Sequence, residues 1–113
     1  MMGPVETETL ETARRFLVEA GQSYSIRNAL LFGSRARSDH NPESDADIAV
    51  ILRGAPGVRS KVAMDMAAIA FEIMLETGIL VEGLPLWEDE FDAPETFSNP
   101  NLVRAIRRDG VPL

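Results

Sequence analysis

The 113-residue chain has no cysteine and a single histidine, His40. These absences exclude a disulfide scaffold, a thiolate zinc site, cysteine catalysis and a histidine-rich metal site. No window approaches the roughly 18 consecutive apolar residues of a membrane span, and the first residues show neither a basic nor an apolar signal segment. We therefore expect a cytoplasmic protein that makes no membrane contact.

Positive charge is also scarce, since 11 Lys and Arg face 18 Asp and Glu, which gives a net charge of −7. Affinity for nucleic acid depends on Lys and Arg displacing condensed counterions, so an extended nucleic-acid surface is not expected. A small anionic ligand held through metal ions stays compatible with this charge. With 45% hydrophobic and 26% charged residues, the composition is typical of one globular domain over residues 1–113.

The apolar residues follow a regular order of helix and strand patterns. Spacings of three and four residues predict helices over 6–20, 58–77 and 100–108, and short apolar runs predict strands over 28–32, 46–52 and 79–86. This order predicts one α/β (α+β) domain. We expect it to have two layers, with a small mixed sheet, helices mainly on one face and an acidic site on the other. The middle helix carries more apolar surface than one sheet face covers, which leaves part of it for a partner.

One combination of residues indicates chemistry. Gly33 and Ser34 follow a strand, and ten residues later Asp45-Ala46-Asp47 opens the next strand. A glycine at such a turn lets a phosphate approach the backbone, while the following amides and a hydroxyl donate to its oxygens. Asp45 and Asp47 are two apart, so they project from one face, where two carboxylates can hold Mg²⁺ bound to a nucleoside triphosphate. The arrangement predicts nucleotidyl transfer.

The segments 33–37 (Gly-Ser-Arg-Ala-Arg) and 44–50 (Ser-Asp-Ala-Asp-Ile-Ala-Val) resemble the signature of the DNA polymerase β-like nucleotidyltransferases, specifically the minimal nucleotidyltransferase branch. The resemblance implies Mg²⁺ ligation by Asp45 and Asp47. It also implies nucleotide binding by residues of the first segment, namely Gly33, Ser34, Arg35 and Arg37. The family usually carries a third carboxylate, more often aspartate, on the third strand. Glu82 is the candidate here, either as a metal ligand or as a base.

These residues lead to the expectation that the chain transfers a nucleoside monophosphate, AMP from ATP, to an acceptor hydroxyl. Because 113 residues leave little room for an acceptor-binding domain, a partner or a dimer groove would supply the acceptor. The resemblance implies a helical HEPN-type ribonuclease toxin as that partner, with this chain as its antitoxin. The alternative is a non-catalytic module that blocks the partner sterically. Adenylylation of a small molecule is disfavoured, since the chain lacks the extra domain that shapes such a pocket.

Several residues also have simpler interpretations. Arg35 and Arg37 can be surface arginines that offset the acidic loop, and His40 is expected to be solvated. Trp87 is expected to anchor the edge of the core rather than to stack on a base. A cluster at the end of the last helix suits the helix dipole without indicating RNA binding; its members are Arg104, Arg107 and Arg108.

Overall fold

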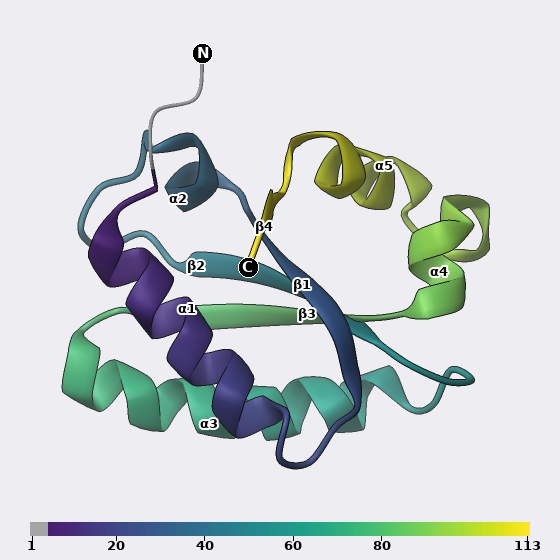
Figure 1. The fold of residues 1–113 in the computed structure, drawn as a ribbon, viewed down its shortest axis with the longest axis horizontal. Coiled ribbons are helices and arrows are strands. Elements are labelled where there is room, and N and C mark those ends of the chain that lie inside the picture. Colours follow the sequence, from purple (N-terminus) through teal and green to yellow (C-terminus); the bar gives the residue numbers. More distant parts are fainter. Residues whose placement is uncertain (1–4) are drawn as a thin grey trace.

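The computed structural model describes residues 5–113 and contains a four-stranded mixed sheet in the order β3-β2-β1-β4 (Figure 1). Strand β1 is antiparallel to β2 and to the short β4, whereas β2 and β3 are parallel. The strands are β1 (Ile26–Phe32), β2 (Ala46–Leu52), β3 (Val81–Trp87) and β4 (Val111–Pro112). The mixed sheet expected from the sequence is confirmed.

Two long helices, α1 (Thr7–Ala20) and α3 (Arg59–Thr77), cover one face of the sheet (Figure 1). Their inner side chains form a core with alternate residues of the strands, including Ile48 and Val50 of β2. The opposite face carries a second apolar cluster, which contains Ala49 and Ile51 and is covered by three short elements. These are α4 (Glu88–Asp92), the 3₁₀ helix η1 (Pro94–Thr96) and α5 (Pro100–Asp109). Because successive residues of β2 point to opposite faces of the sheet, this strand contributes side chains to both apolar clusters.

The ends of the helices follow the residues that predict them. The side chain of Asn99 accepts a hydrogen bond from the Leu102 amide at 3.3 Å, and Pro100 takes the first turn of α5. Gly78 ends α3 in the left-handed conformation, with φ of 77°, and its amide donates to the Met74 carbonyl. Within residues 5–113, no helix is long and apolar enough to cross a membrane.

The structure differs from the sequence prediction in its shorter elements. Strand β1 begins two residues earlier than expected, and β3 begins at Val81 rather than Ile79 and continues through Trp87. The elements α2 (Ser34–Arg37), α4, η1 and β4 are too short to show a period. Trp87 is 5% exposed with the Arg59 guanidinium over its ring, which confirms its core role.

Both outer strands of the sheet have protected edges. On β3, the Pro85 carbonyl accepts a hydrogen bond of 2.6 Å from Arg59, whose guanidinium also makes a two-pronged ion pair with the buried Glu90. On the other edge, β4 has only two residues, one of them Pro112.

Candidate active site

A row of three side chains crosses the sheet at one end. The strand register places Phe32 of β1 beside Asp47 of β2, and Asp47 beside Glu82 of β3. The neighbours of Asp47 in β2, Ala46 and Ile48, are buried in the core under α1 and α3, so Asp47 points to the opposite face. Asp47 therefore lies on the sheet face away from the long helices, as expected for the acidic site.

The Asp47 carboxylate occupies the space that a Cβ at position 33 would need, which only glycine leaves free. The residue lies between β1 and α2 with φ of 75°, a conformation that side chains with a Cβ rarely adopt. A Cβ built there would collide with Oδ2 of Asp47 and lie 3.4 Å from its Cγ. The glycine of the motif therefore brings the backbone at the start of α2 directly against the carboxylate, where a shared ligand would contact both.

The electrostatics of Asp47 show an excess of negative charge. Burial, repulsion by Glu82 and Asp45 and a hydrogen bond with Glu82 together raise its pKa from 3.8 to about 6, with burial as the largest cause. Arg37 acts in the opposite direction but does not cancel these effects. Because a nearby cation favours an ionised carboxylate, the site is one that a divalent cation would stabilise.

The carboxylates do not form a complete metal cage by themselves. Among residues 5–113, no group of three His, Cys, Asp or Glu side chains is placed to hold a metal ion. Mg²⁺ is usually held by one or two carboxylates together with waters and substrate phosphates. The chemistry of Asp45 and Asp47 fits that mode of binding, and Glu82 as a third ligand stays a prediction.

Glu82 itself is exposed although it lies within an apolar strand. The reason is the strand order, because β3 is the outer strand of the sheet and the side chain of Glu82 reaches solvent at its edge. No desolvation cost therefore requires a cation at Glu82.

Arg35 has a structural role rather than the predicted place beside a phosphate. Its side chain is 2% exposed, and its guanidinium donates to the carbonyls of Ser44 at 2.8 Å and Pro42 at 3.3 Å. It also donates to Thr9 Oγ1 at 2.8 Å and pairs with Glu6 at 3.2 Å. These partners use the donors of the guanidinium, so Arg35 fastens the loop before β2 to the start of α1.

Arg37 and His40 occupy different environments. Arg37 is exposed, pairs with Asp39 at 3.1 Å and influences the pKa of Asp47, so it remains in the neighbourhood of the site. The expectation that His40 is solvated is wrong, because its side chain is only 12% exposed and its Nε2 lies 3.5 Å from a carboxylate oxygen of Glu6. The loop that contains His40 folds back toward the start of α1, so the His40 side chain is largely shielded from solvent.

A family model described as polymerase beta, nucleotidyltransferase matches residues 17–82. The matched segment runs from within α1 to Glu82 and contains all seven residues proposed for the site from the sequence. The chain belongs to this nucleotidyltransferase family. No curated protein gives a significant match. Among solved structures, a protein of Sulfolobus solfataricus provisionally assigned as a nucleotidyltransferase is 25% identical, with a TM-score of 0.53 over 81% of this chain and 84% of that chain.

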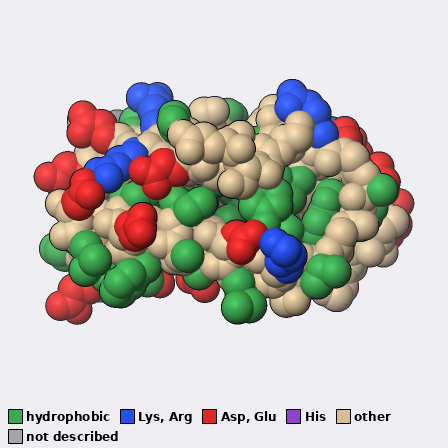
Figure 2. Space-filling model, turned by 90° about the horizontal axis from the view of Figure 1, so that it is seen from below, with side chains coloured by type: hydrophobic (Ala, Val, Ile, Leu, Met, Phe, Trp, Pro, Cys, Tyr) green, Lys and Arg blue, Asp and Glu red, His purple; other side chains and the backbone are tan. Residues whose placement is uncertain are grey.

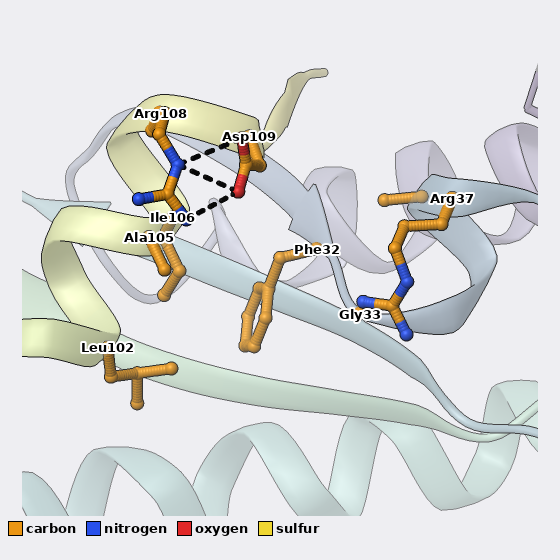
Figure 3. Close-up of a pocket in the computed structure, with 9 residues that line it drawn as sticks. Phe32, Gly33, Arg37, Leu102, Ala105, Ile106, Arg108 and Asp109 are labelled. Atoms are coloured by element: carbon orange, nitrogen blue, oxygen red, sulfur yellow. Dashed lines mark hydrogen bonds and ion pairs between the residues drawn. The ribbon is translucent and has the colours of Figure 1, made fainter. Parts of the chain in front are cut away.

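In this nucleotidyltransferase domain, two cavities flank the row formed by Phe32, Asp47 and Glu82. One, of about 330 Å³, is shared by Asp45 and Glu82; its other walls come from β3 and from small residues of α3, namely Ala63, Ala67 and Ala70. The second, of about 420 Å³, lies between α2 and α5. In Figure 3 the Phe32 ring projects into it between Leu102 of α5 and Arg37 of α2.

The α5 side of the second cavity could not be anticipated from the sequence. Leu102, Ala105 and Ile106 line it together with Arg108 and Asp109, which pair with each other at 2.8 Å (Figure 3). These residues come beside Gly33 only because the chain returns to β1 through α5 and β4. The helical pattern of α5 predicts an apolar stripe and not what that stripe covers.

Proposed function

We propose that this domain catalyses Mg²⁺-dependent transfer of a nucleoside monophosphate, AMP from ATP, to an acceptor hydroxyl. Family membership supports nucleotidyl transfer in general. The observation that carries the finer proposal is the position of Asp47, pressed against the Gly33 backbone and repelled by two further carboxylates. Such a carboxylate favours a bound cation, and the adjoining backbone offers donors to the phosphates that accompany it.

Each predicted residue has a distinct part in this reaction. Asp45 and Asp47 would hold Mg²⁺, which when bound neutralises the triphosphate and the departing pyrophosphate. The Ser34 amide and hydroxyl would donate to oxygens of the β- and γ-phosphates where Gly33 admits them, and Arg37 would add positive charge. The acceptor oxygen forms a bond to the α-phosphorus as the bond to pyrophosphate breaks.

We propose that Glu82 receives the proton that the acceptor hydroxyl loses. It shares a cavity with Asp45, so an acceptor in that cavity would lie against both carboxylates. Glu82 is exposed, and its carboxylate can reach toward either the acceptor or the metal, which keeps both predicted roles open.

Isothermal titration with ATP tests this proposal. We expect binding that requires both Mg²⁺ and the aspartates, because carboxylates repel a bare triphosphate and attract it through a divalent cation. The double variant Asp45→Asn/Asp47→Asn should not bind, whereas Glu43→Gln, which removes one exposed carboxylate from the neighbouring loop, should bind like wild type. Wild-type protein that is folded by circular dichroism and binds no nucleoside triphosphate under any metal condition would overturn the catalytic proposal.

A second candidate function is a binding module that neutralises a HEPN-type partner without catalysis. Glu82 favours this candidate, because the family more often carries aspartate at this place and a relic site would keep the fold while its metal set changes. Incubating the partner with the domain, ATP and Mg²⁺ separates the two functions. A mass increase of one adenylyl group supports catalysis, whereas neutralisation of an unmodified partner supports the module.

A further inference from the structure

The cavity of about 420 Å³ between α2 and α5 has no role yet in the proposed reaction. It adjoins Asp47, because two of the residues that line it, Gly33 and Arg37, also approach that carboxylate. The Gly33 backbone lies against the carboxylate, and Arg37 is close enough to act on it electrostatically. A ligand whose phosphates lie at Gly33 therefore has this cavity within reach of its other end.

The walls of the cavity suit a flat aromatic ring. The Phe32 ring projects into it, with Leu102 of α5 on one side (Figure 3), and Ala105 and Ile106 of the same helix add apolar surface. Phe32 and Leu102 are half-buried, so both keep apolar area that a ligand can cover. Nucleobases stack favourably on aromatic side chains. The volume also lies within the range of small-molecule pockets, about 300–1,000 Å³.

The end of α5 supplies polar groups to this cavity. Arg108 and Asp109 line it together and pair with each other at 2.8 Å (Figure 3). The hydrogen bond from Arg108 lowers the pKa of Asp109, so Asp109 is ionised at neutral pH and can only accept hydrogen bonds. On one edge, adenine presents an amino group that donates beside a ring nitrogen that accepts, whereas guanine presents two acceptors there. An acceptor beside a donor, as in Asp109 and Arg108, matches adenine.

The cavity on the Glu82 side differs in these respects. It is walled by small residues of α3 and by the carboxylates of Asp45 and Glu82, and within residues 5–113 its walls include no aromatic or basic side chain. Figure 2 views the molecule from the α3 side and shows hydrophobic side chains interspersed with acidic ones. A base would find no ring to stack on there, which leaves that cavity to the acceptor.

We propose that the cavity between α2 and α5 binds the base of the nucleoside triphosphate, with adenine stacked on Phe32 and its amino group donating to Asp109. This inference rests on the proposed function, since the cavity can select a base only if the phosphates bind at Gly33. Helix α5 lies outside residues 17–82, the segment that the family model matches. The base would thus be selected by a part of this chain that the family model does not describe.

Titration calorimetry in Mg²⁺ with two probes, ATP and inorganic tripolyphosphate, separates the base from the phosphates. Ala105→Phe fills the cavity from α5, so it should weaken ATP binding about tenfold or more and leave tripolyphosphate binding unchanged. Retained tripolyphosphate binding also shows that the variant is folded. Asn101→Phe adds the same ring at an exposed position of α5 outside the cavity and should bind both probes like wild type. Phe32→Leu should weaken ATP binding alone, and Phe32→Tyr should keep it.

A comparison of ATP with GTP tests the choice of base. We expect wild type to prefer ATP and Asp109→Ala to reduce that preference about tenfold, whereas Glu95→Ala, which removes an exposed carboxylate outside the cavity, should keep it. A preference for GTP, or none, would overturn adenine as the base.

The two probes also distinguish this inference from the proposed function. A folded wild type that binds neither probe would overturn the proposed function and this inference with it. Binding of both probes, with ATP binding unaffected by Ala105→Phe and by Phe32→Leu, would overturn the base cavity alone.

Discussion

Replacing Asp47 by asparagine should stabilise the metal-free protein at neutral pH. In the folded chain, burial and the neighbouring carboxylates raise the pKa of Asp47 from the ordinary value of 3.8 to about 6. Because one pKa unit corresponds to about 1.4 kcal/mol, ionised Asp47 disfavours folding by about 3 kcal/mol. Asparagine keeps the shape and removes the charge, so the free energy of unfolding should rise by as much as about 3 kcal/mol.

The pH dependence gives this prediction its sign. Well below pH 3.8, Asp47 is protonated in both folded and unfolded chains, and its charge costs nothing. Between pH 3.8 and about 6, the folded chain holds the proton more tightly than the unfolded chain, so the contribution of Asp47 to stability falls as pH rises. The cost is complete above about pH 6, so the advantage of Asp47→Asn over wild type should grow from about pH 4 to about pH 7.

Urea unfolding in the presence of a chelator measures this advantage. Glu43→Gln is the matched control, because it removes one exposed carboxylate from the same chain of net charge −7 and corrects for general charge repulsion. Addition of Mg²⁺ and ATP should stabilise wild type and Glu43→Gln but not Asp47→Asn, since only Asp47→Asn lacks this ligand for the metal. Equal effects of the two substitutions, or a less stable Asp47→Asn at pH 7, would refute the reasoning from charge repulsion.

Three further substitutions test neighbouring parts of the site. Glu82→Gln should lower the pKa of Asp47 toward its ordinary value, as followed by NMR titration of the carboxyl carbon; an unchanged pKa would contradict their coupling. Gly33→Ala should abolish Mg²⁺-ATP binding in titration calorimetry and destabilise the fold, whereas Gly54→Ala, also at positive φ but in open space, should cost only about 1–2 kcal/mol and still bind. Arg35→Met should lower the free energy of unfolding by about 3 kcal/mol and speed limited proteolysis within 38–45; wild-type resistance would show that the loop holds without it.

Much of the fold could be predicted from local patterns. Strand β2 runs over Ala46–Leu52 as expected, because a continuous apolar run is typical of a strand buried on both faces. Helix α3 follows its apolar spacing of three and four residues, because this spacing places apolar side chains on one face of a helix. Helix α4 could not be found this way, since its acidic residues indicate a loop and its Glu90 is held by Arg59, which lies 31 residues earlier. Such distant pairing leaves no local signal.

The candidate site shows the same division. Alternation along β2 was enough to place Asp47 on the face away from α1 and α3, because neighbouring strand residues point in opposite directions. The motif could not reveal where the guanidinium of Arg35 goes, since that depends on Thr9, 26 residues earlier in α1. Likewise, the exposure of Glu82 depends on β3 being the outer strand, which is a property of the strand order and not of the segment.

The protected outer strands limit how this sheet can grow. A strand added beside β3 would meet Pro85, which has no amide hydrogen to donate and whose carbonyl is already bound by Arg59. A strand added beside β4 would find only two residues, one of them Pro112. Extension of the sheet from molecule to molecule, as in strand exchange or fibril growth, is therefore blocked on both sides.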